Sequence, residues 1–166
     1  IMGGSFKTRE IDDIDVIRVP TVRGHLRFWW RALYASDFTN SEELYQRESE
    51  LWGAASGEEG GRSAVEIHIK FRRNDKGEIE ESVIGVTDRS DFHPSRTEGA
   101  YALWPARRET NRPGAPRRKP GTKFELILKI AGTSDDEEQV RNTLRAWILF
   151  GGYGGRTRRG LGSLTV

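Results

Sequence analysis

Apolar and polar residues alternate along two segments of the chain, and each segment is predicted to form a half-buried β-strand. Side chains on a strand point to opposite faces in turn, so a period of two marks one buried and one exposed face. The apolar faces consist of Val65, Ile67, Ile69 and Phe71 in residues 63–71, and of Phe124, Leu126, Leu128 and Ile130 in residues 123–130. Residues 74–77 read as a turn, after which residues 78–86 are expected to pair back as a hairpin. Residues 101–104 form a further short strand candidate.

Three other segments carry the helical period. Residues 22–35 are predicted to be a helix capped by Thr21, with Trp29 facing the core and Trp30 at its border. Residues 41–52 are predicted to be a second helix, anchored by Leu44, Leu51 and Trp52. A third helix is expected from a capping box at residues 134–137 to about Phe150, where glycines stop it. Its inward residues are Val140, Leu144, Trp147 and Ile148.

The order of these elements predicts an α+β fold. With one strand added in front, the chain reads β-α-β-β-α-β, the ferredoxin-like (RRM-like) arrangement of an antiparallel sheet with two helices on one face. Ile1-Met2-Gly3-Gly4 and Leu164-Thr165-Val166 then read as pieces of the first and last strands, which suggests a fragment of a longer protein. Residues 1–166 are expected to form one domain, with residues 105–121 as a basic, proline-rich mobile loop.

Charge is segregated along the chain although the net charge is only +2. Residues 42–60 hold six glutamates and one arginine, whereas residues 105–123 hold five arginines, two lysines and one glutamate. Such asymmetry favours a surface that attracts anions. The chain has no cysteine, which excludes disulfides and thiolate metal sites. It also has no signal peptide pattern and no apolar run of about 20 residues, so a cytoplasmic location is expected.

The densest chemical pattern lies in residues 151–163, which contain six glycines and three arginines. Glycine backbones can turn successive N–H groups into one concavity, and arginine supplies planar donors that match phosphate oxygens. The segment follows a helix instead of opening one, unlike a Walker loop, which argues against nucleotide hydrolysis. Two interpretations of this segment are open: it forms a cradle for a polyanion, or it is a flexible connection whose arginines are solvated. The candidate RNA-binding residues here are Gly151, Gly152, Gly154, Gly155, Arg156, Thr157, Arg158, Arg159 and Gly160.

A second basic feature lies on the first predicted helix. Arg23, Arg27 and Arg31 recur every four residues and form a stripe beside Trp30. Guanidiniums that follow phosphates, with a ring that stacks on a base, suit single-stranded nucleic acid. The alternative is a solvated polar face with both tryptophans buried. Arg107, Arg108, Arg117, Arg118 and Lys119 in the proline-rich loop are secondary candidates, which could equally be solvated.

Few residues suggest catalysis. Asp12, Asp13 and Asp15 cluster before the first helix, where a carboxylate could orient a ribose 2′-hydroxyl or hold a divalent ion. His25 could act as a base, although helix packing or RNA contact suits it better. The three histidines show no metal-ligand spacing, so no metal or other cofactor is expected. These four residues are the catalytic candidates of a second hypothesis, in which the protein is an endoribonuclease. The alternative for the three aspartates is an ordinary polar loop.

Two of these motifs resemble those of a known family. Residues 151–163 resemble the glycine-rich loop of the RAMP superfamily of CRISPR–Cas RNA-binding proteins. Residues 20–32, Pro-Thr-Val-Arg-Gly-His-Leu-Arg-Phe-Trp-Trp-Arg-Ala, are similar to the first helix of the Cmr subunit numbered one, from the type III-B effector complex. Residues 101–105 also fit a strand of that subunit, and only its N-terminal domain is represented here.

The resemblance implies a non-catalytic subunit that binds guide RNA (crRNA) near its 3′ end, single-stranded target RNA, or both, in antiviral defence. Its partners would be other RAMP subunits of the complex, with no membrane involved. The segment could also come from a fused, single-chain effector. Beside this hypothesis stand an endoribonuclease of the same superfamily and a protein-assembly module without RNA contact.

Overall fold

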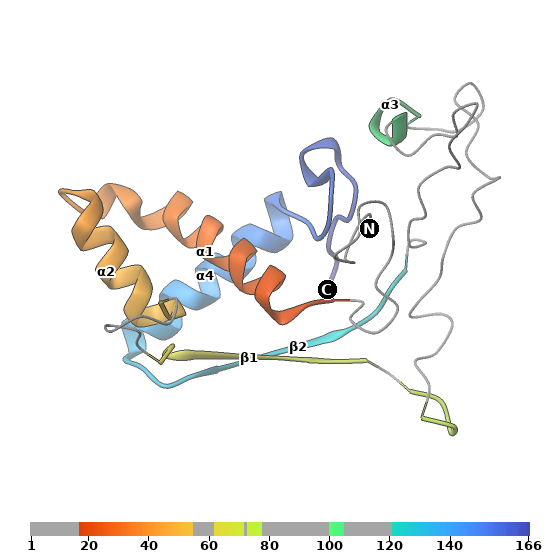
Figure 1. Ribbon diagram of the computed structural model, residues 1–166, viewed down its shortest axis with the longest axis horizontal. Coiled ribbons are helices and arrows are strands. Elements are labelled where there is room, and N and C mark those ends of the chain that lie inside the picture. Colours follow the sequence, from red (N-terminus) through yellow and green to blue (C-terminus); the bar gives the residue numbers. More distant parts are fainter. Residues whose placement is uncertain (1–16, 55–61, 72, 78–99, 105–120) are drawn as a thin grey trace. The chain divides into compact units, whose positions relative to one another are not determined.

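The structure is a computed structural model that describes residues 17–54, 62–71, 73–77, 100–104 and 121–166 (Figure 1). The chain divides into two compact units. The helical unit comprises residues 19–69 and 126–150, and the loop unit comprises residues 1–18, 70–125 and 151–166. None of the described helices has the length and apolar character needed to cross a membrane.

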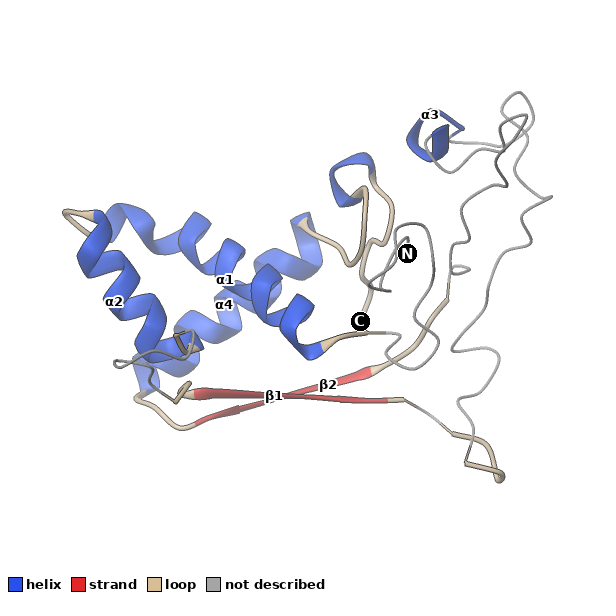
Figure 2. Ribbon diagram, in the orientation of Figure 1, coloured by secondary structure: helices blue, strands red, loops and turns tan. Residues whose placement is uncertain are grey.

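The helical unit packs three helices on one side of a two-stranded sheet (Figure 2). Helix α1 spans Val19–Tyr34, α2 spans Ser41–Trp52 and α4 spans Ser134–Phe150. Strands β1, Val65–Lys70, and β2, Glu125–Ile130, are neighbours in the sheet. The N–H of Ala131, just after β2, donates to the carbonyl of Ala64, just before β1, at 2.8 Å. The two strands are therefore antiparallel.

The core of this unit lies where α1 crosses α2 and α4. Its fully buried large side chains include three tryptophans, each from a different helix: Trp30, Trp52 and Trp147. Val65 and Ile67 contribute the buried face of β1, as their alternation predicts. On the same strand, His68 and Lys70 are exposed.

Several sequence predictions are confirmed. The bounds of α2 agree with the expected helix at residues 41–52, and α4 ends at Phe150 as expected. Both predicted strands are present, slightly shorter than expected. The turn at residues 74–77 is present as well, closed by a hydrogen bond from the Gly77 N–H to the Asn74 carbonyl at 2.9 Å.

The start of α1 differs from the prediction. The helix begins at Val19, and Thr21 lies inside it instead of capping it. Proline lacks an N–H, but the first turn of a helix needs no internal donor, so Pro20 fits there and does not delay the helix. The rotation of α1 also differs: Val22, Leu26 and Trp30 are buried, while Leu33 is 42% exposed. The core stripe therefore runs strictly every four residues.

The cap of α4 lies one residue earlier than predicted. The Thr133 hydroxyl accepts from the Asp136 N–H at 3.2 Å, and the Asp136 carboxylate accepts from the Thr133 N–H at 2.7 Å. This is the reciprocal pattern of a capping box, made by Thr133 and Asp136 instead of Ser134 and Glu137. Burial raises the pKa of Asp136, but hydrogen bonds from Thr133 and Arg47 outweigh it and hold the pKa below its ordinary value.

Two strand predictions are wrong. Residues 100–103 form a short helix, α3, Ala100–Leu103, where a strand at 101–104 was expected. Alternation over four residues does not distinguish the two states, and alanine and leucine favour helix. Residues 164–166 are described and form no strand, since a strand exists only where a neighbour pairs with it.

The complete ferredoxin-like arrangement remains a prediction. Its expected first strand, the returning strand at 78–86 and the proline-rich loop through residue 120 lie outside the described residues. The described part establishes an α+β architecture with one antiparallel strand pair.

Candidate nucleic-acid interface

The three arginines of the α1 stripe, Arg23, Arg27 and Arg31, are here called the helix arginines, and all three bind groups within the helical unit. Arg23 Nη1 donates to the Trp52 carbonyl at 2.5 Å and to the Ser63 hydroxyl at 2.9 Å. Arg27 Nη1 donates to the Gly53 carbonyl at 3.2 Å. The last carbonyls of a helix have no partner inside it, so these guanidiniums satisfy the C-terminal end of α2.

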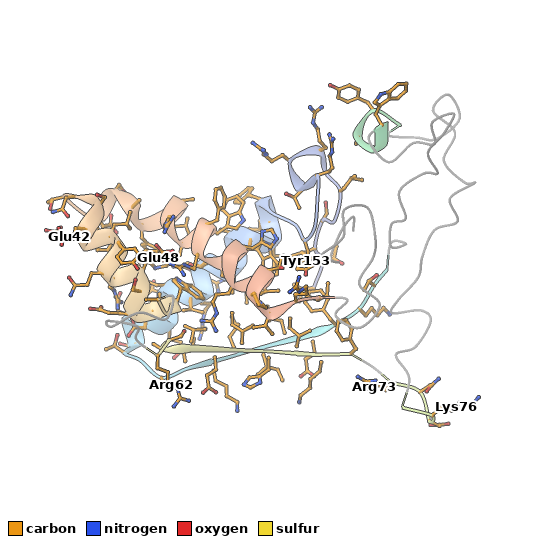
Figure 3. The ribbon with its side chains drawn as sticks, in the orientation of Figure 1. Glu42, Glu48, Arg62, Arg73, Lys76 and Tyr153 are labelled. Carbon is orange, nitrogen blue, oxygen red and sulfur yellow. The ribbon has the colours of Figure 1, made fainter. Side chains whose placement is uncertain are left out.

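Glu48 of α2, labelled in Figure 3, accepts hydrogen bonds from two of the helix arginines, Arg27 and Arg31. Its carboxylate is fully buried on the side of α2 that faces α1. It accepts from Arg27 Nε at 2.6 Å and from Arg31 Nε at 2.7 Å, with a further short contact to Arg31 Nη2. One buried carboxylate thus neutralises part of the charge of two arginines, which stay partly exposed at 27% and 51%.

These contacts change the interpretation of the stripe. It is neither a free row of guanidiniums nor a merely solvated face, because it holds α1 against α2. Burial, and then the charge of Arg27, lower the pKa of Arg23. RNA binding by the helix arginines stays a prediction. These side chains already have hydrogen-bond partners within the protein.

The proposed stacking role of Trp30 is wrong. Trp30 is fully buried, and its indole N–H donates to Gln139 Oε1 of α4 at 2.9 Å. A ring with no exposed surface cannot stack on a base. Trp29, predicted to face the core, is instead only half-buried and lies 6.2 Å from the ring of Phe150, measured between centroids.

His25 occupies a packing position. Its imidazole stacks on Trp147 of α4 with ring centroids 5.8 Å apart, and burial lowers its pKa. This agrees with helix packing as its role. The other catalytic candidates, Asp12, Asp13 and Asp15, lie outside the described residues, as do the secondary arginines at 107, 108, 117 and 118 and Lys119. Within the described ranges, no three acidic or histidine side chains gather as a metal site would require.

Residues 151–163, here called the glycine loop, close on their own backbone. The Tyr153 N–H donates to the Gly162 carbonyl at 2.8 Å. Gly162 has a φ of +72°, and a Cβ there would lie 2.0 Å from the Tyr153 carbonyl oxygen. A Cβ on Gly152 would likewise lie 2.8 Å from the Gly162 carbonyl oxygen. Only glycine allows the two arms of the loop to approach this closely.

Tyr153 anchors the base of the glycine loop. Its side chain is buried, and its hydroxyl accepts from the Arg18 N–H at 2.8 Å. The loop is therefore tied both to itself and to the segment just before α1. The base of the loop is thus closed by contacts of its own residues, while its use as a cradle for a polyanion stays a prediction.

The tip of the glycine loop is a short 3₁₀-helix, Thr157–Arg159, between two left-handed residues. Arg156 is one of these, with a φ of 69°, and its carbonyl accepts from the N–H of Arg159 at 2.9 Å. A left-handed non-glycine residue costs on the order of 1 kcal/mol, and such strain concentrates at functional sites. The strained position thus lies where the loop presents its arginines.

Arg156, Arg158 and Arg159, here called the tip arginines, are exposed and have no acidic partner within the described residues. With Thr157 they line a hollow of about 610 Å³. The helix arginines, by contrast, include two that share Glu48. The loop therefore offers three positive charges for an external anion, in the planar form that suits phosphate.

The residues that sequence analysis missed carry recognisable signals. Glu48 falls one turn from Leu44 and Trp52, at an inward position of an otherwise acidic helix, which marks a charge with a buried partner. Tyr101 and Trp104 lie three residues apart, a helical spacing hidden by the strand interpretation. The anchoring role of Tyr153 carries no signal in the sequence beyond an aromatic residue among glycines.

Comparison with known proteins shows the family to which this chain belongs. The family model described as the RAMP superfamily matches residues 1–165. The chain belongs to the RAMP superfamily. A similar curated protein is the CRISPR system Cmr subunit Cmr1-1 of Pyrococcus furiosus (strain ATCC 43587 / DSM 3638 / JCM 8422 / Vc1), 26% identical over 165 residues. That match covers 96% of this chain but 42% of the relative, so the RAMP chain described here spans under half the length of its relative.

A solved crystal structure is similar in fold. The crystal structure of Cmr1 from Pyrococcus furiosus in its apo form matches 89% of this chain with a TM-score of 0.59. The sequences are 22% identical, and the match covers 40% of the solved chain. The α+β architecture of the described residues is thus that of part of Cmr1.

Proposed function

We propose that this chain is an RNA-binding, non-catalytic part of a type III-B CRISPR (Cmr) effector complex. The observation that carries the proposal is the glycine loop, whose tip arginines form no ion pair within the described residues. Membership of the RAMP superfamily and similarity to a Cmr subunit give the context. The RNA partners would be guide RNA near its 3′ end, target RNA, or both, and the protein partners other RAMP subunits.

The chemistry of the loop suits a phosphate backbone. Three guanidiniums within four residues place positive charge around one hollow, and no acidic side chain of the described part competes for them. Backbone contacts position an RNA strand without reading its bases, so the loop should bind strands of different sequence similarly. Arg159 also lies over the ring of Tyr101.

The test is fluorescence anisotropy of a labelled single-stranded RNA across a salt series. Replacing the tip arginines by alanine should weaken binding and make the salt dependence shallower by about 2 in slope, at roughly 0.7 per phosphate contact. The matched control replaces Arg62, Arg141 and Arg145, three exposed arginines elsewhere, and changes net charge equally. If the two triple substitutions weaken binding equally, the effect comes from net charge and not from the loop, and the proposal is overturned.

The same samples test the non-catalytic assignment. With Mg²⁺ added, the RNA should remain intact on a denaturing gel. Cleavage at regular positions that is lost on Asp12→Asn, Asp13→Asn or Asp15→Asn would instead establish an endoribonuclease. Full assembly with partner subunits and no RNA contact by the loop would favour a protein-assembly module.

A further inference from the structure

A tyrosine outside the glycine loop lies against one of its arginines. The guanidinium carbon of Arg159 is 4.8 Å from the ring centroid of Tyr101 on α3. This is inside the distance of about 6 Å at which a cation is attracted to an aromatic face. Arg159 also lowers the pKa of the Tyr101 phenol, by hydrogen bonding and by its charge. Both residues belong to the loop unit.

Most of the surface of Tyr101 is exposed. It is 74% exposed, and Trp104, three residues later, is 47% exposed. Large aromatic side chains usually bury most of their surface, so two exposed rings within four residues call for an explanation. Because Arg159 lies over one face of Tyr101 and the ring is largely exposed, the opposite face is accessible.

We propose that Tyr101, with Trp104 beside it, stacks a base of the single-stranded RNA whose phosphates bind the tip arginines. This inference rests on the proposed function and adds a second kind of contact to it. Every base has a π-face, so stacking would add affinity without demanding a particular sequence. Arg159 would take part in both contacts, because its guanidinium borders the hollow and lies over the ring.

The composition of the site favours a nucleotide over a protein ligand. The cores of protein interfaces are depleted of charge, whereas here the exposed Tyr101 ring lies against Arg159, one of three arginines without acidic partners in the described part of the chain. Positive charge that follows a backbone, combined with exposed aromatic faces, is the usual arrangement for binding single strands. A protein partner is left as an outcome of the test.

The experiment compares two RNA probes of equal length and charge: an ordinary single strand and one in which the bases are replaced by abasic sites. Tyr101→Ala should weaken binding of the ordinary strand by about 5- to 150-fold, the range for loss of one stacked base. It should leave binding of the abasic strand and the salt slope unchanged. Tyr101→Phe and Tyr101→Trp should retain affinity, because either ring can stack.

The matched control is Tyr45→Ala, a tyrosine of α2 that is 55% exposed, which should bind both probes as the unsubstituted protein does. A second readout uses 2-aminopurine in the RNA, whose fluorescence is quenched by stacking. The quenching on binding should be lost in Tyr101→Ala. Since Tyr101 is exposed, thermal unfolding of this variant should match that of the unsubstituted protein.

The outcomes separate the two proposals. If substitution of the tip arginines weakens binding but Tyr101→Ala binds the ordinary strand normally, stacking is overturned and the phosphate cradle stands. If the tip arginine variant and its control bind alike, both proposals fall. If Tyr101→Ala abolishes association with a partner subunit while RNA binding is unchanged, the rings belong to a protein interface.

Discussion

Glu48 accepts a 2.6 Å hydrogen bond from Nε of Arg27, and its carboxylate is fully buried between α2 and α1. A charged group removed from water needs partners that replace its hydration. Arg27 and Arg31 supply them through side chains that still reach solvent. The arginines whose spacing suggested a nucleic-acid surface therefore have a measurable structural role.

Removing the charge of Glu48 should destabilise the fold. Glu48→Gln keeps the shape of the side chain but weakens its contacts with Arg27 and Arg31. We expect the free energy of unfolding to fall by about 1–3 kcal/mol, since hydrogen bonds to charged groups are lost while both arginines can turn to water. Urea denaturation measures the loss. The control is Glu50→Gln, on the same helix but exposed, which should stay within about 0.5 kcal/mol. Equal stability of the two variants would contradict the prediction.

Two aromatic residues of α1, Trp30 and Phe28, should respond very differently to truncation. Trp30→Ala empties a buried site and removes the hydrogen bond to Gln139, so we expect a loss of about 3–5 kcal/mol. Phe28 is 63% exposed, and Phe28→Ala should change stability by no more than about 0.5 kcal/mol. Thermal and urea unfolding of both variants check this difference. A mild effect at Trp30 would mean that α1 is rotated differently about its axis.

The glycine loop offers a paired test of backbone geometry. Gly160 and Gly162 both have positive φ values, of +78° and +72°, but only Gly162 lies against other backbone atoms. Gly160→Ala should cost only the conformational strain, about 1 kcal/mol. Gly162→Ala adds a steric clash with the Tyr153 carbonyl and should open the loop, lowering RNA affinity as strongly as loss of the tip arginines. Similar RNA affinities for the two alanine variants would refute the closed loop.

His25 should make stability depend on pH near neutrality. Burial against Trp147 lowers its pKa below the usual 6.5, so the folded state binds a proton less readily than the unfolded state. Stability contributed by the neutral ring is complete above pH 6.5 and declines as the pH falls below that value. His25→Gln should flatten the decline between pH 7 and 5, measured by urea unfolding at each pH. An imidazole pKa above 6.5 by NMR would reverse the sign.

Much of the helical unit could be predicted from the sequence because its signals are local. Alternation in residues 63–71 and the apolar anchors of residues 41–52 each report burial of one face. The rotation of α1 was harder, because Trp29 and Trp30 are equally apolar and the period of 3.6 fits either. Burial of Trp30 depends on Gln139, which lies more than a hundred residues away and meets it only in the folded protein.

In the candidate site, too, only the features with a local sequence signal could be predicted. The glycine loop was found because glycine and arginine reveal backbone freedom and charge directly. Two of the helix arginines pair with Glu48 of α2, so they are not free to bind an external anion. The periodicity of α1 alone does not reveal a charged residue on the helix packed against it. Tyr101 was missed because a four-residue segment has too little length to display a period, and its contact with Arg159 joins positions 58 residues apart.

The closed base of the glycine loop has a consequence for how its recognition can change. Tyr153 and Gly162 hold the two arms together through main-chain atoms and a buried ring, and none of these groups belongs to residues 156–159. Side chains at the tip can therefore be substituted without removing the contacts of Tyr153 and Gly162 that hold the loop closed. In evolution or in the laboratory, new side chains at Thr157, Arg158 and Arg159 would change which polyanion the loop binds, while the residues that hold the loop closed stay the same.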